Sequence, residues 1–166
     1  MIVREIQVAT LDGSAHDNLY EGMICMYELF ARILYTYKWK SDFGKINIIL
    51  YPNSINKRTK YGNIIEYEIY FDFDLYISLS QQDRRKHIIV LIYKRLMIFA
   101  SEYELDTSPV EETYKKCVKF NFENKWIHLD KKYTSPKKDY KIQVECEWNE
   151  THLNVYMIQL DKAGQI

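Results

Sequence analysis

Two aspartates near the middle of the chain have the spacing of a paired-carboxylate site. Asp72 and Asp74 alternate with Phe71 and Phe73. On an extended strand, residues two apart point to the same side and lie about 6.5–7 Å from each other. Hard divalent cations bind paired carboxylates, so this pair offers one route to metal-dependent chemistry.

The segment Phe71-Asp72-Phe73-Asp74 resembles the Asp-x-Asp strand of nucleotidyltransferases and some glycosyltransferases. That resemblance implies nucleotidyl or phosphoryl chemistry at Asp72 and Asp74. The nucleotidyltransferase pattern also has a Gly-Ser turn that opens a helix, and the nearest such turn, Asp12-Gly13-Ser14, lies far upstream. A small metal-dependent enzyme is therefore the alternative to a binding function.

Two histidines offer a metal-free route to catalysis. His128 and His152 fall in neighbouring strand patterns, and either Glu145 or Glu147 could lie beside them. Together they could form an acid–base pair of the ribonuclease kind. Two histidines in a sheet are more often separate surface residues. No Walker-type glycine loop, dinucleotide fingerprint or zinc-peptidase motif is present, and we expect no cofactor.

The two aspartates belong to a longer alternating run over residues 65–80, which predicts one half-buried strand. Its outward side would be acidic and rich in tyrosine, which suits a basic protein partner. The predicted partner-binding residues are Glu66, Glu68, Tyr70, Asp72, Asp74 and Tyr76. Sixteen extended residues would span about 50 Å, against about 40 Å for the whole domain. A break near Tyr70 or Phe71 is thus an alternative, and it would split the strip.

A basic cluster follows this run. Arg84-Arg85-Lys86-His87 falls in the first turn of a predicted helix, where cations oppose the helix dipole. Such placement can mark an anion site. The other interpretation is that Asp83 and the preceding acids neutralise the cluster, and the sequence favours it.

Composition limits the class of protein. Lys plus Arg equals Asp plus Glu, 23 each, which argues against non-specific nucleic-acid binding. The cysteines, Cys25, Cys117 and Cys146, match no metal-ligand spacing, and we expect them to be reduced. No signal peptide and no apolar run of about 18 residues is visible, so we expect a cytoplasmic protein without a membrane segment.

The periodicity predicts a single α+β domain over residues 1–162 and a frayed tail over 163–166. We expect a largely antiparallel sheet with two long helices and one short helix packed on one face. Residues 53–63, with Lys57, Arg58 and Lys60, should form the basic tip of an antiparallel hairpin. The expected helices begin at Asp17, Ser80 and Ser108, and the expected strands cover 2–11, 46–51, 65–80, 118–122, 126–129, 140–148 and 152–160.

In general character the chain resembles the immunity proteins that protect bacteria from secreted or contact-delivered toxin domains. These are small, single-domain inhibitors, and many cover a basic nuclease site with an acidic surface. The resemblance implies that the acidic, tyrosine-bearing strip binds a basic toxin domain. A third hypothesis is a homodimer, in which the strip meets Lys57, Arg58 and Lys60 of a second copy.

Overall fold

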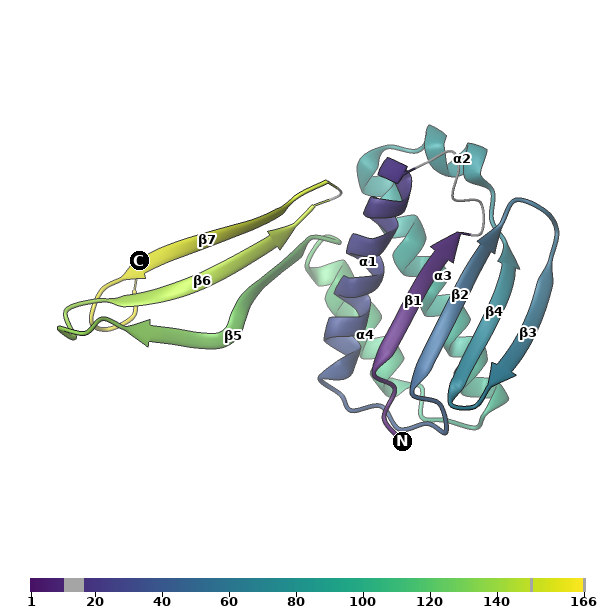
Figure 1. Ribbon diagram of the computed structural model, residues 1–166, viewed down its shortest axis with the longest axis horizontal. Coiled ribbons are helices and arrows are strands. Elements are labelled where there is room, and N and C mark those ends of the chain that lie inside the picture. Colours follow the sequence, from purple (N-terminus) through teal and green to yellow (C-terminus); the bar gives the residue numbers. More distant parts are fainter. Residues whose placement is uncertain (11–16, 150, 166) are drawn as a thin grey trace.

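The computed structural model describes residues 1–10, 17–149 and 151–165. They form a helix-covered main sheet and a separate three-stranded sheet (Figure 1). We call residues 1–123 the body and the strands from Asn124 to Leu160 the arm. Within these residues, four helices and two sheets confirm the α+β class. The turn predicted at Asp12-Gly13-Ser14 lies outside the described residues.

The main sheet has the strand order β1-β2-β4-β3. Its strands are β1 (Glu5–Thr10), β2 (Lys45–Tyr51), β3 (Asn56–Tyr61) and β4 (Ile64–Tyr70). β1, β2 and β4 are mutually parallel, and β3 forms an antiparallel hairpin with β4. The predicted antiparallel pairing of 46–51 with the strand after it is wrong. The chain runs back along β3 at the sheet edge before it enters β4, so β2 and β4 point the same way.

Three helices cover one side of the main sheet. α1 (Asp17–Tyr35) packs against β1 and against α3 (Gln81–Glu102), and α4 (Ser108–Lys119) packs against both helices. On β2 the side chains alternate, and Ile46, Ile48 and Leu50 are fully buried on the helix side. Figure 1 shows no described helix over the opposite side, which we call the open sheet face. None of the described helices is long and apolar enough to span a membrane.

The predicted N-cap of α3, Ser80, is confirmed, and the predicted N-cap of α4, Ser108, is wrong by one residue. The Ser80 hydroxyl accepts a hydrogen bond from the Asp83 backbone N–H, as expected of an N-cap. At α4 the cap is Thr107, and Ser108 is already helical. The strand predicted over 118–122 is wrong. α4 continues to Lys119, and Asn121 and Phe122 turn the chain with positive φ of 51° and 57°.

The single strand predicted over 65–80 is also wrong. β4 ends at Tyr70, and residues Phe73–Ser78 form the short helix α2. Asp72 is the N-cap, because its Oδ1 accepts the Leu75 backbone N–H at 2.9 Å. After Tyr70 the alternation no longer separates two faces, because Phe71 and Tyr76 are buried together, with their rings 5.3 Å apart, whereas Leu75 and Ile77 are exposed. A favourable cap and a compact ring cluster thus outweigh the two-residue period.

The arm is an antiparallel meander of β5 (Asn124–Thr134), β6 (Lys141–Trp148) and β7 (Leu153–Leu160). The hairpin predicted between 140–148 and 152–160 is confirmed. In total, three of the five strand pairings in the described residues are antiparallel. Figure 1 shows the arm extending away from the body, with β7 at its free edge.

A small polar joint holds the arm to α1. The Asn124 side chain donates to the Cys25 carbonyl at 2.8 Å and accepts from Arg32 at 2.6 Å. The Arg32 guanidinium also lies 4.7 Å from the Trp126 ring centroid. The Cys25 thiol donates to the Trp148 carbonyl at 2.9 Å. These contacts join the start of β5 and the end of β6 to α1.

Candidate functional site

The six residues of the predicted strip lie on two elements and do not form one surface. Glu66, Glu68 and Tyr70 belong to β4, and the other three belong to the α2 segment. Tyr76 is 2% exposed, so it can offer no contact area. The break that the length argument anticipated at Tyr70 or Phe71 is the one observed.

On the open sheet face, the acidic side chains have local partners. Glu68 is buried and bonds Lys57 at 2.9 Å, across the β3–β4 hairpin. This hydrogen bond and charge raise the pKa of Lys57. Partial burial, followed by the charge of Glu68, raises the pKa of Tyr51. Much of the negative charge on β4 is therefore already compensated, although Tyr70 stays exposed.

The basic segment expected to bind a second copy is paired within the chain. Lys57 bonds Glu68, and Arg58 bonds Glu102 at 2.7 Å. Lys60 lies 4.7 Å from the Tyr103 ring centroid. All three belong to strand β3 and do not form a hairpin tip. The homodimer hypothesis in that form would need these contacts to exchange for intermolecular ones.

The two predicted catalytic pairs are not assembled. Asp72 caps α2, and Asp74 lies two residues further along the helix, where it faces another direction. No group of three metal-ligating side chains occurs in the part of the chain that the structure describes. In the arm, the β-sheet register places His128 and His152 about five residue levels, or about 17 Å, apart.

One side of the arm is a continuous apolar surface that sequence reasoning missed. Cross-strand pairs place Val144 opposite Met157 and Cys146 opposite Val155. Met157 is 79% exposed and Val155 59%, so neither is covered by the rest of the described chain. The alternation of apolar residues in both strands predicts that one side of the hairpin is apolar, but it does not tell whether anything covers that side. We call this surface, made of Ile142, Val144, Leu153, Val155 and Met157, the apolar arm face.

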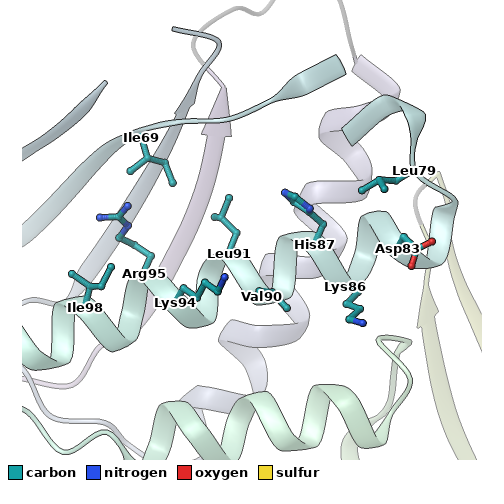
Figure 2. A pocket seen from close by; sticks show the side chains of 10 residues that line it. All are labelled: Ile69, Leu79, Asp83, Lys86, His87, Val90, Leu91, Lys94, Arg95 and Ile98. Atoms are coloured by element: carbon teal, nitrogen blue, oxygen red, sulfur yellow. The ribbon is translucent and has the colours of Figure 1, made fainter. Parts of the chain in front are cut away.

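A groove of about 650 Å³ lies beside α3 and below the end of β4 (Figure 2). Lys86 and His87, from the predicted basic cluster, line it. Arg84 does not, because its Nε donates to the Leu79 carbonyl at 3.0 Å. Burial, and then the charge of Lys94, lower the pKa of His87, while Asp72 opposes the shift.

Comparison with known proteins adds no assignment. No protein-family model, no curated protein and no solved structure matches this chain.

Proposed function

We propose that this chain is a non-catalytic protein-binding domain that docks a partner through the apolar arm face. The observation that carries the proposal is the exposure of that face, with Leu153 53%, Val155 59% and Met157 79% exposed. Contiguous exposed apolar surface of this kind marks interaction sites in soluble proteins. Side chains held on paired strands also present this contact area already ordered, which lowers the entropic cost of binding.

The free edge of the arm supports the same proposal. β7 contains no charged residue and no proline across its eight positions. Proteins usually protect exposed edge strands with lysine, proline or a bulge, because unpaired N–H and C=O groups attract other strands. An edge without this protection, next to an apolar face, is suited to contact with another chain.

We further propose that the partner is a basic toxin domain and that the chain is an immunity-type inhibitor acting in the bacterial cytoplasm. Tyr70, Asp72 and Asp74 remain exposed where β4 passes into α2, and they keep part of the predicted acidic, tyrosine-bearing surface. Charges at the rim of an interface accelerate association more than they tighten it. In this proposal the apolar arm face supplies most of the affinity, and the β4–α2 corner supplies steering.

The test is coexpression with the protein encoded beside this chain's gene. We expect cells carrying a toxic neighbour to survive only when this chain is present, and the two proteins to co-elute. Val155→Lys with Met157→Lys should weaken the purified complex about tenfold or more, because two charges would be buried. Tyr156→Lys is the matched control, since Tyr156 lies between these residues on the opposite face of the arm.

Three outcomes separate the parts of the proposal. Asp72→Lys with Asp74→Lys should slow association and reduce its salt dependence. A complex that survives the double lysine change on the arm would contradict docking through the apolar arm face. Light scattering on the chain alone tests whether a second copy of the chain covers the apolar arm face instead. A dimer that Met157→Lys abolishes would mean that it does.

A further inference from the structure

The groove beside α3 combines an apolar floor with a cationic rim. Arg95, Leu91 and His87 rise from successive turns of α3 toward the strand that carries Ile69 (Figure 2). Five of the lining side chains are aliphatic and four are basic or imidazole. The lining residues are Ile69, Leu79, Asp83, Lys86, His87, Val90, Leu91, Lys94, Arg95 and Ile98.

The cations of the groove have no acidic partner within the described chain. Lys86, Lys94 and Arg95 form neither an ion pair nor a hydrogen bond with any described residue. Asp83 is the one acid in the lining, and its carboxylate accepts the Ser80 hydroxyl at 2.6 Å at the start of α3. The groove therefore carries an excess of positive charge.

Arg95 is the cation of the groove that is most withdrawn from water. Its guanidinium is half-buried and lies 5.2 Å from the Tyr67 ring centroid. Burial lowers the pKa of Arg95. Glu102 is the nearby carboxylate, but it accepts hydrogen bonds from Arg58 at 2.7 Å and from Tyr67 at 2.8 Å instead. The charge of Glu102 therefore offsets the burial of Arg95 only in part. A cation partly withdrawn from water without a direct carboxylate partner is unfavourable, and a bound anion would relieve this.

We propose that this groove binds a small amphipathic acid, a carboxylate on an aliphatic chain. Arg95 and Lys94 hold the head group, and the chain lies along Leu91 and Val90 toward Leu79. The distance along α3 from Lys94 to His87 is about 11 Å at 1.5 Å per residue, which suits a medium-length chain. The volume of about 650 Å³ falls within the usual range of ligand pockets, about 300–1,000 Å³. This site is independent of the proposed partner binding, which uses the arm.

The test is calorimetric titration of the full chain with laurate, below its critical micelle concentration. A second titration uses dodecanol, the uncharged analogue of the same length. We expect laurate to bind at a 1:1 ratio and at least about tenfold more tightly than dodecanol, because charge-assisted hydrogen bonds hold the carboxylate. Methyl NMR signals of Val90, Leu91 and Ile98 should shift on binding. Signals from Val155 on the arm should not.

Variants decide which side chains are responsible. Arg95→Gln and Lys94→Gln should each weaken laurate binding several-fold, and Val90→Trp should abolish it by filling the groove. Lys137→Gln is the matched control, since Lys137 is an exposed lysine in the β5–β6 turn of the arm. Lys94 is exposed, so its replacement tests the site even if Arg95→Gln destabilises the fold.

The proposal is overturned if laurate does not bind, or if dodecanol binds equally well. It is also overturned if Lys94→Gln and Val90→Trp leave the affinity unchanged. Loss of laurate binding with intact partner docking, or the reverse, keeps the failure of this proposal distinct from failure of the proposed function.

Discussion

The body and the arm are stabilised in different ways. In the body, α1, α3 and one side of the main sheet share a continuous core that includes Phe30, Ile48 and Phe99. In the described part of the arm, Cys146 and Leu160 are the only buried hydrophobic residues. The arm thus depends on its strand pairings and on the joint with α1. A three-stranded sheet without a core of its own is expected to open more readily than the body.

The edge strands of the two sheets show the same difference. β3, at the edge of the main sheet, carries Lys57, Arg58 and Lys60, and these charges discourage pairing with other strands. β7, at the edge of the arm, carries none. The body is protected against association where the arm is not. The surface best suited to contact with another chain therefore lies on the arm, which is the part of the molecule expected to open more readily.

The largest expected effect lies in the core of the body. Phe99 is fully buried, and its ring lies 5.6 Å from that of Trp39 and 5.0 Å from that of Tyr103. Phe99→Ala should lower the free energy of unfolding by about 3–5 kcal/mol, because it leaves a cavity. Met157→Ala on the arm should change it by less than about 0.5 kcal/mol. Urea denaturation measures both, and comparable losses would contradict the contrast between body and arm.

The next effect concerns the joint. Asn124→Ala removes the hydrogen bonds to Cys25 and leaves Arg32 without its acceptor, a local cost of about 1–3 kcal/mol. Amide hydrogen exchange should accelerate across β5, β6 and β7 and stay unchanged in α3. Asn124→Asp keeps an oxygen for Arg32 but loses the donor to Cys25, so it should be intermediate. Equal acceleration in α3 would show that arm and body open together.

The elements that could be predicted from sequence are those in which local signals agree with tertiary packing. α3 has the Ser80 cap, a helical period and a core to cover, and its start was predicted to the residue. The last hairpin has two alternating strands and a short turn, and it was also found. At Asp72 two local signals compete, and the N-cap of α2 prevails over the period of two on which the predicted strand rests.

Long-range order could not be read from one-dimensional patterns. β2 and β4 are neighbours, but their relative direction depends on β3, and the polar sequence of β3 is typical of a turn. Likewise, Val155 and Met157 alternate as buried residues do, yet nothing in the described chain covers them. Periodicity tells which residues share a face, and it does not tell what lies opposite that face.

A smaller effect distinguishes two buried thiols. Burial raises the pKa of Cys117, on α4, to about 12, so at pH 8 it should react with N-ethylmaleimide only when the body unfolds. Cys146 is buried where the arm meets the body and should react sooner, through opening of the joint. Mass spectrometry of partly labelled protein gives the order. Asn124→Ala should accelerate labelling of Cys146 and leave that of Cys117 unchanged. First reaction at Cys117 would invert the proposed order of stability.

The smallest effect is a pH dependence that belongs to the body. His87 lies 5.5 Å from the Phe71 ring and 6.0 Å from the Tyr76 ring, and burial lowers its folded pKa. The unfolded chain therefore binds a proton more readily, so stability should fall as the pH drops below about 6.5. His87→Phe keeps the ring contacts and should flatten this acid limb in thermal melts. The arm does not contain His87. At acid pH, His87→Phe should therefore slow amide hydrogen exchange in α3 more than in the arm. An unchanged acid limb in His87→Phe would assign the pH dependence to another residue.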